Sequence, residues 1–209
     1  MKLNLSLLSL SLILIGLIIF YTKQEVYTNP KIYPDLITPQ EARYILNKSG
    51  FMASELVGSD LDTSVRKSET LWISKNDPGV IDIYKRLKNK FHFNIENAED
   101  IQVVKYQPGG FYKPHHDACC EDNESCKDFI KRGGQRVLTI LIYLNDDFEE
   151  GSTKFPTLNL DLKAPKYGGV VFYPLDSAKK CHPDALHGGN PVKSGTKYIA
   201  NIWVHENKF

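Results

Sequence analysis

Two imidazoles and one carboxylate stand side by side at His115-His116-Asp117. On a β-strand, residues i and i+2 project from the same face. A strand here would let His115 and Asp117 bind one metal ion, while His116 points to the opposite face. A hard carboxylate combined with an imidazole suits Fe(II), Mn(II) or Zn(II). The competing interpretation is an ordinary surface triplet, and residues elsewhere in the chain decide between the two.

A metal site of this type needs a third ligand, and four further histidines are candidates: His92, His182, His187 and His205. His92 stands between two phenylalanines at the end of a predicted helix, which indicates a structural role. His182 precedes a proline in a loop. His187 is followed by two glycines, which allow the backbone to approach a ligand closely.

A lysine interrupts an apolar strand pattern at the start of Lys197-Tyr-Ile-Ala-Asn-Ile-Trp203. The period of two places Lys197, Ile199, Asn201 and Trp203 on one face. A single lysine that faces inwards from such a strand is suited to anchor a ligand that carries a carboxylate. The alternative is a solvated lysine on the surface of the strand.

Short β-rich runs separated by Gly-rich turns dominate from Ile101 onwards. They are Ile101–Tyr106, Phe111–Ala118, Gln135–Leu144, Val170–Tyr173 and Tyr198–Val204. This pattern predicts a β-sandwich or barrel. Two amphipathic helices precede it, one opened by the capping box that starts at Thr38 and one opened by Asp77-Pro78. Cys119–Gly134 is predicted to be a turn-rich insertion beside the candidate site.

The first residues form a separate apolar segment. Leu3–Thr22 has 20 residues without a charge, and as a helix it would be about 30 Å long, enough to cross the hydrocarbon core of a bilayer. No small-residue cleavage site follows it, which favours an uncleaved signal anchor over a cleavable signal peptide. We therefore expect a transmembrane signal anchor over residues 1–22, a linker over residues 23–37 and a folded domain over residues 38–209. Lys2 and Lys23 flank the segment and leave its orientation open.

The charge of the folded part is balanced. The chain has 26 Lys+Arg and 25 Asp+Glu, and residues 1–22 contain one Lys and no acidic residue. A neutral domain argues against a nucleic-acid partner, which requires a basic surface. Four cysteines are compatible with a disulfide-forming lumen, although their pairing stays open.

Five sequence motifs follow one another in a characteristic order. They are Tyr106…His115-x-Asp117, Arg136-Val-Leu-Thr139-Ile-Leu-Ile-Tyr143-Leu-Asn145, Gly151-Ser-Thr153-Lys-Phe155-Pro156, His187-Gly-Gly-Asn-Pro191-Val192 and Gly195-Thr-Lys197-Tyr-Ile-Ala-Asn-Ile-Trp203. With these motifs the chain resembles the prolyl 4-hydroxylase family of Fe(II)- and 2-oxoglutarate-dependent dioxygenases. The resemblance covers roughly Thr38–Glu206 and is dense from Ile101 onwards. It implies an α+β fold with a double-stranded β-helix (jelly-roll) core and supporting N-terminal helices.

The resemblance also implies a role for individual residues. His115, Asp117 and His187 would be the iron ligands, and Lys197 would pair with the distal carboxylate of 2-oxoglutarate. By the same resemblance, Tyr106, Thr139 and Tyr143 would line the co-substrate pocket, Trp203 would lie near the metal, and Arg66 would lie close to the substrate groove. The resemblance implies Fe(II), 2-oxoglutarate, O2 and L-ascorbate as cofactors and co-substrates.

The expected function is the hydroxylation of proline in a peptide or protein substrate, with oxidative decarboxylation of 2-oxoglutarate to succinate and CO2. This expected function and the apolar segment together predict a single-pass membrane protein whose catalytic domain lies in the lumen of the endoplasmic reticulum. Three alternatives stay open: a lysyl hydroxylase, a nucleic-acid demethylase of the same superfamily, and a non-catalytic module that binds a metal or a peptide. Lysyl hydroxylases usually have Arg at the position of Lys197, which favours the prolyl interpretation.

Two departures from the family pattern bear on the site. The residue between the histidine and the aspartate is usually aromatic or small, and here it is His116. If His116 bound the metal instead of His115, the same-face argument would fail. The family's Gly-Gly-Glu-Thr segment is one residue shorter here, at Gly151-Ser152-Thr153, which changes the expected turn geometry but not the ligands.

Overall fold

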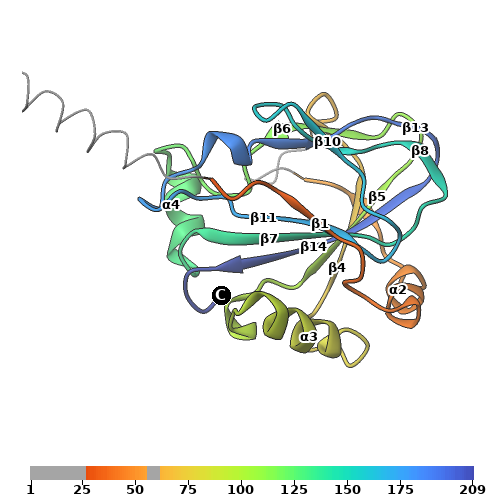
Figure 1. Cartoon of the computed structure of the whole chain (residues 1–209), viewed down its shortest axis with the longest axis horizontal. Helices are drawn as coiled ribbons and strands as arrows, with labels where there is room; N and C mark the ends of the chain where they lie inside the picture. Colours follow the sequence, from red (N-terminus) through yellow and green to blue (C-terminus); the bar gives the residue numbers. More distant parts are fainter. Residues whose placement is uncertain (1–26, 56–61) are drawn as a thin grey trace, which may run out of the picture.

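The computed structural model describes residues 27–55 and 62–209, and within them the chain is built mainly of antiparallel strands (Figure 1). The larger sheet has the order β1 (Lys31–Tyr33), β11 (Gly169–Phe172), β7 (Arg136–Tyr143), β14 (Lys197–His205), β5 (Ile101–Tyr106), β4 (Glu69–Ile73) and β2 (Met52–Ala53). The smaller sheet has the order β10 (Leu160–Leu162), β9 (Thr153–Phe155), β12 (His187–Gly189), β6 (Phe111–His115) and β3 (Arg66–Lys67). A separate pair joins β8 (Phe148–Glu150) to β13 (Val192–Gly195). The prediction of a mainly β fold with a few helices is confirmed.

The two long central strands alternate between two hydrophobic cores. On β7, Leu138, Ile140 and Ile142 belong to one core, and Leu141 and Tyr143 belong to the other. The first core is completed by the helices α2 (Pro39–Leu46) and α3 (Ile81–Phe91), which lie on the outer side of the larger sheet (Figure 1). The second core lies between the two sheets and includes side chains of β9 and β11. Every second residue of β7 and β14 therefore faces the interior between the sheets, where the candidate site lies.

The two predicted helices form, with one change of boundary. Thr38 caps α2 by accepting a hydrogen bond from the Glu41 backbone N–H at 3.2 Å, while the Glu41 carboxylate accepts one from the Thr38 backbone N–H at 2.7 Å. The second helix begins at Ile81 instead of directly after Asp77-Pro78. Asp77 accepts hydrogen bonds from the Gly79 and Val80 backbone N–H groups, which closes a turn before the helix.

Two further expectations need correction. The predicted linker over residues 23–37 contains β1, which pairs with β11, and Leu36 and Ile37 are buried in the first core. From Lys31 onwards this segment is therefore part of the folded domain. The predicted insertion Cys119–Gly134 contains a helix, α4 (Glu124–Lys131), whose N-cap Asn123 accepts a hydrogen bond from the Cys126 backbone N–H at 2.8 Å.

Two disulfides resolve the pairing that the sequence left open. Cys119 pairs with Cys126 across the start of α4, and Cys120 pairs with Cys181. The second bond joins the segment after Asp117 to the segment after β11. Both segments flanking the candidate site are thus covalently fixed.

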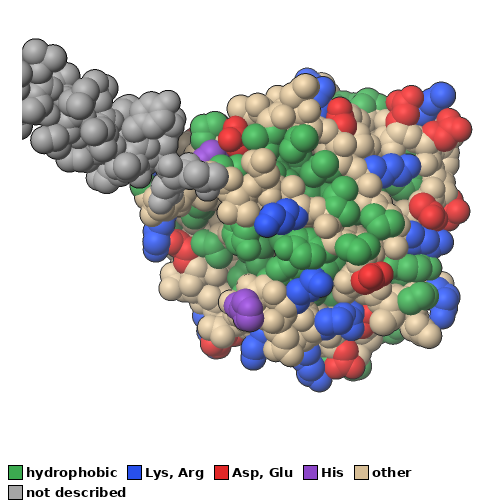
Figure 2. All heavy atoms as spheres, viewed as in Figure 1, with side chains coloured by type: hydrophobic (Ala, Val, Ile, Leu, Met, Phe, Trp, Pro, Cys, Tyr) green, Lys and Arg blue, Asp and Glu red, His purple; other side chains and the backbone are tan. Residues whose placement is uncertain are grey.

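The surface carries charges of both signs. In the face shown in Figure 2, Lys and Arg side chains are interspersed with Asp and Glu side chains around apolar patches. Among the residues that the structure describes, no helix is both long enough and apolar enough to cross a bilayer. The predicted anchor, residues 1–22, lies outside the described ranges.

Candidate metal centre

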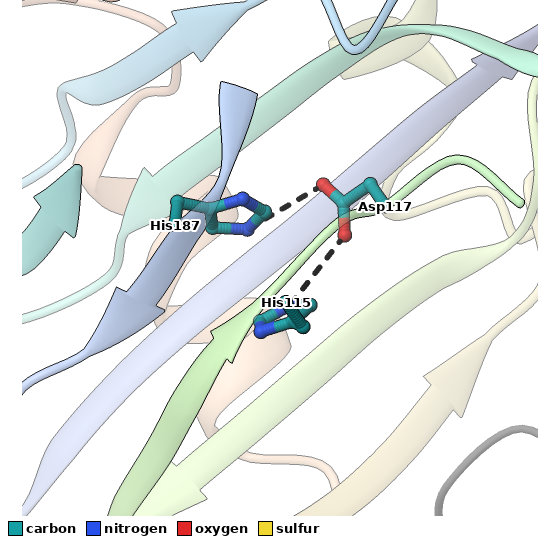
Figure 3. Close-up of side chains that lie close together, drawn as sticks. All are labelled: His115, Asp117 and His187. Carbon is teal, nitrogen blue, oxygen red and sulfur yellow. Dashed lines mark ion pairs between the residues drawn. The ribbon is translucent and has the colours of Figure 1, made fainter. Parts of the chain in front are cut away.

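Three side chains converge at one end of the smaller sheet (Figure 3). One ligand atom from each of His115, Asp117 and His187 lies within 4.8 Å of the other two. The His115 Nε2 atom is 3.7 Å from Asp117 Oδ1, and the His187 Nε2 atom is 3.6 Å from Asp117 Oδ2. The two imidazoles thus face different oxygens of the same carboxylate, as the dashed lines in Figure 3 show.

The local backbone differs from the strand that the sequence predicted. β6 ends at His115 instead of continuing to Ala118, and Asp117 lies in the bend that follows. The side chains of His115 and Asp117 still converge, but the bend after the strand brings them together, not the alternation within it. His116 is not part of the cluster, and its half-buried ring lines the edge of the same cavity.

His187 reaches the cluster through strand pairing. It is the first residue of β12, and its direct partner across the antiparallel ladder is His115 in β6. Gly188, the next residue, allows the close approach of the two strands. A Cβ atom there would lie 2.8 Å from the Tyr112 carbonyl oxygen, so a larger residue would force the backbones apart.

The hydrogen bonds of the two imidazoles leave their Nε2 atoms free to bind a metal. His115 Nδ1 lies 2.9 Å from the Lys113 carbonyl oxygen, and His187 Nδ1 lies 3.0 Å from the Ala185 carbonyl oxygen. A carbonyl oxygen only accepts, so each Nδ1 carries the proton and each Nε2 presents a lone pair. The lone pairs of the two Nε2 atoms and the Asp117 carboxylate therefore point to one place, and none of them carries a proton there. This donor set fits a divalent cation such as Fe(II).

The protonation states of the buried groups also favour metal binding. Burial alone would raise the pKa of Asp117, but the combined effect of His187, His115, Arg136 and the hydrogen bond from Thr139 lowers the pKa to about 2. Burial, with a further contribution from His187, lowers the pKa of His115 to about 3. Near neutral pH, Asp117 is therefore a carboxylate and His115 is neutral, which are the forms that bind metals.

Thr139 orients the carboxylate. Its hydroxyl donates a hydrogen bond of 2.7 Å to Asp117 Oδ2, and its side chain is fully buried on the interior face of β7. The Thr139 hydroxyl is therefore used by the metal centre, whereas the resemblance had placed it in the co-substrate pocket.

Lys197 is the most deeply buried cation of the cavity. It is 2% exposed, and its Nζ atom donates a hydrogen bond of 2.7 Å to the Gly151 carbonyl oxygen. The ammonium group also lies 5.3 Å from the ring of Tyr106 and 5.0 Å from the ring of Tyr143. Burial, with a smaller contribution from the charge of Lys163, lowers the pKa of Lys197 to about 7. The predicted inward orientation of Lys197 is confirmed, and no acidic partner contacts it within the described part of the chain.

A single cavity of about 360 Å³ contains the triad and Lys197. Three more of the expected site residues line it and are buried: Tyr106, Trp203 and Arg66. Tyr143 does not line the cavity directly, and its hydroxyl is hydrogen-bonded to Thr153 at 2.8 Å and to the Leu162 carbonyl oxygen at 3.2 Å. Tyr143 therefore supports the wall behind Lys197.

Several residues of the site were not recognised in the sequence. The ring of Tyr112 stacks on that of His115 with 3.6 Å between centroids, and the Arg66 guanidinium lies 4.7 Å above the ring of Tyr112. Arg136 donates from Nη1 to the Asp117 carbonyl oxygen at 3.2 Å and lies 3.9 Å above the ring of Trp203. Arg136 opens one of the five sequence motifs and stands at the start of a strand, but neither signal reveals these contacts.

Comparison with known proteins places this geometry in a family. Residues 101–205 match the family model of the 2OG-Fe(II) oxygenase superfamily. The chain is 45% identical to a protein of Acanthamoeba polyphaga mimivirus named "Putative prolyl 4-hydroxylase", over 88% of this chain and 77% of the relative. It is 31% identical to Prolyl 4-hydroxylase 1 of Arabidopsis thaliana, over 82% of this chain and 67% of the relative.

A solved structure agrees with these relatives. The viral collagen prolyl hydroxylase of Paramecium bursaria Chlorella virus-1, in its 2-oxoglutarate complex, superposes with a TM-score of 0.66. The two sequences are 29% identical, and the match covers 85% of this chain and 96% of that one. The chain therefore belongs to the prolyl 4-hydroxylase family of Fe(II)- and 2-oxoglutarate-dependent oxygenases.

Proposed function

We propose that this protein hydroxylates proline residues in a peptide or protein substrate and converts 2-oxoglutarate to succinate and CO2 in the same cycle. The observation that carries this proposal is the occurrence of the His115, Asp117 and His187 cluster and the buried Lys197 in one cavity. The chemistry supplied there, once Fe(II), 2-oxoglutarate and O2 are bound, is the insertion of oxygen into an unactivated C–H bond.

Different side chains would bind the metal and the co-substrate. His115, Asp117 and His187 would hold Fe(II) through the two free Nε2 atoms and the carboxylate. Lys197 would pair with the distal carboxylate of 2-oxoglutarate, because it is a buried cation without an acidic partner in the described structure. The mouth of the cavity is left for the substrate.

Two unpartnered polar atoms support a peptide as the substrate. Trp203 Nε1, a donor, and Asn201 Oδ1, an acceptor, are buried and have no hydrogen-bond partner among the residues that the structure describes. Both residues line the cavity from the same face of β14. Buried polar groups are normally paired. A peptide offers a carbonyl and an N–H group along its main chain, which matches this donor and acceptor.

The substrate class is tested by mass spectrometry. Proline-rich peptides are incubated with the full-length chain, Fe(II), 2-oxoglutarate and ascorbate, and the products are sequenced. We expect a gain of one oxygen on proline together with an equal amount of succinate, and no gain with the Asp117→Ala variant. Oxidation that occurs at lysine alone would assign the chain to lysyl hydroxylases instead.

We further propose that the domain works in the lumen of the endoplasmic reticulum, held there by residues 1–22, with L-ascorbate maintaining the ferrous state. The two disulfides support this location, because such bonds persist in oxidising compartments. Microsomes that contain the full-length chain provide the test. We expect residues 38–209 to resist added protease until detergent is present; digestion without detergent would reject a lumenal domain.

A further inference from the structure

Two large apolar side chains are exposed at the rim of the cavity. Met52 in β2 is 71% exposed and Trp72 in β4 is 48% exposed, and both belong to the lining of the cavity that contains the metal centre. β2 pairs with β4 at the edge of the larger sheet, where Met52 lies opposite Thr70. Thr70 and Trp72 project from the same face of β4, so the two apolar side chains and the cavity share one surface.

The fold itself does not require Trp72. The opposite face of β4 supplies Leu71 and Ile73 to the core beneath the helices. Trp72 faces the cavity side instead and remains about half exposed. An exposed tryptophan beside an exposed methionine at the mouth of a site is the kind of apolar surface that marks a ligand or protein contact.

The exposed pair is continuous with the metal centre through one row of side chains. The rings of Trp72 and Trp203 are 6.2 Å apart between centroids. Trp203 lies directly opposite Thr139 in the pairing of β14 with β7, and Thr139 donates its hydrogen bond to Asp117. Trp72 is also the register partner of Gln102, which pairs in turn with Asn201. The surface therefore leads from the reacting region to the rim without a break.

We propose that Trp72 and Met52 form an apolar subsite that selects a residue flanking the target proline. This inference rests on the proposed function and adds which substrate sequences the protein prefers. An extended polyproline-type chain rises about 3.1 Å per residue. A residue over Trp72 would therefore lie about two positions away from a residue over Trp203. Glu55, an exposed acidic residue at the same rim, disfavours an acidic side chain at this position.

The occupant is the substrate chain itself, and its preferred chemistry is an apolar side chain. We expect a peptide with leucine at one position within three residues of the target to bind about five- to tenfold more tightly than the peptide with aspartate at that position, because burial of part of a side chain of this size contributes on that scale. The other flanking positions should show no comparable preference.

The test measures peptide binding and hydroxylation separately. A peptide set carries one target proline and places leucine or aspartate at each of the three positions on either side. Binding of each labelled peptide to the full-length chain is measured by fluorescence anisotropy, and hydroxylation by mass spectrometry. The Trp72→Ala variant should lose the five- to tenfold preference, and Trp72→Phe should retain most of it. If the peptides bind but none is hydroxylated, the proposed activity is rejected. The preference for leucine over aspartate in binding still decides whether the subsite exists.

The matched control is Tyr173→Ala. Tyr173 is exposed to a similar extent, 41%, but does not line this cavity, so its removal should leave the preference unchanged. Circular dichroism confirms that each variant is folded. Equal binding of all peptides by the unaltered protein, or an unchanged preference in folded Trp72→Ala, would overturn the proposal.

Discussion

Asp117 is held through both its side chain and its backbone. The Thr139 hydroxyl donates to Oδ2, and the Arg136 guanidinium donates to the backbone carbonyl oxygen of Asp117. Loss of a residue that orients a metal ligand typically lowers the affinity for the metal by about 10- to 100-fold. The consequence is that Thr139 belongs functionally to the metal centre, although its hydroxyl contacts no metal.

This role predicts the effect of Thr139→Val, which removes the hydroxyl and keeps the shape of the side chain. We expect Fe(II) affinity to fall about 10- to 100-fold, while the free energy of unfolding of the metal-free protein falls by about 1 to 3 kcal/mol, because the buried Asp117 carboxylate loses a donor. Titration with Fe(II) under anaerobic conditions and urea unfolding measure the two quantities. Thr139→Ser, which keeps the hydroxyl, is the control, and equal Fe(II) affinity in both variants would contradict the assignment.

Lys197 predicts a dependence on pH. Burial lowers its pKa to about 7, and pairing with a carboxylate requires the protonated form. Below pH 7 the ammonium is already charged, whereas above pH 7 the binding of 2-oxoglutarate must also take up a proton. The KM for 2-oxoglutarate should therefore rise between pH 7 and pH 9, by at most about tenfold per pH unit. Steady-state kinetics across this range measure the slope, and a flat profile would contradict it.

Lys197→Ala provides the companion prediction at a single pH. Loss of a buried charge-assisted contact corresponds to roughly 1.5 to 3 kcal/mol, or about a 10- to 150-fold rise in the KM for 2-oxoglutarate. Fe(II) affinity, measured by the same anaerobic titration, should remain close to that of the unaltered protein. Equal loss of both affinities would show that Lys197 supports the cavity as a whole instead of the co-substrate.

At the residue scale the sequence was most informative where a side chain follows strand alternation. The inward orientation of Lys197, Asn201 and Trp203 could be predicted because β14 is a long regular strand. The hydroxyl partners of Thr139 and Tyr143 could not, because strand alternation fixes the face of a residue but not the contact it makes across the sheets. Those contacts depend on the bend at Asp117 and on the close approach of β9.

At the scale of elements, the pairing of β12 with β6 assembles the metal centre. His187 lies opposite His115, and Gly188 passes the Tyr112 backbone at a distance that excludes a side chain. The strands β5, β7, β11 and β14 could be predicted to within two residues, because each is an apolar run bounded by turn residues. The end of β6 could not, since the bend after His115 depends on tertiary contacts.

Gly188→Ala tests this pairing. The added Cβ would meet backbone atoms of β6, which cannot move aside without disturbing the ladder. We expect Fe(II) affinity to fall at least about tenfold, because His187 leaves its position opposite His115. Gly189→Ala is the matched control, since a Cβ there would meet its nearest atom at 3.7 Å, an ordinary contact. Similar Fe(II) affinities for the two variants would refute this account.

At the scale of the whole molecule, the Cys120–Cys181 disulfide ties together segments that are 61 positions apart in the sequence. The sequence offered the four cysteines but no pairing, because the pairing depends on which loops the fold brings together. The first residues stay a prediction, since the signal anchor over residues 1–22 lies outside the described structure.

We expect loss of the Cys120–Cys181 disulfide to lower the free energy of unfolding strongly. The chain-entropy estimate for a loop of this length is about 4 kcal/mol, against about 2 kcal/mol for the short loop closed by Cys119 and Cys126. Replacing Cys120 and Cys181 by serine should therefore lower the free energy of unfolding about twice as much as replacing the other pair. Urea unfolding of the two double variants measures the difference, and equal losses would argue against a contribution that depends on loop length.

The pairing of His187 with His115 has a consequence for the order of events in the cell. The ribosome releases His115 and Asp117 long before His187, and the two parts of the ligand set meet only when β12 pairs with β6. A nascent chain that ends before His187 therefore offers an incomplete ligand set, which retains iron less firmly than the finished protein. We therefore expect iron loading to follow translation, and we expect a truncated chain that ends before β12 to be released without its metal.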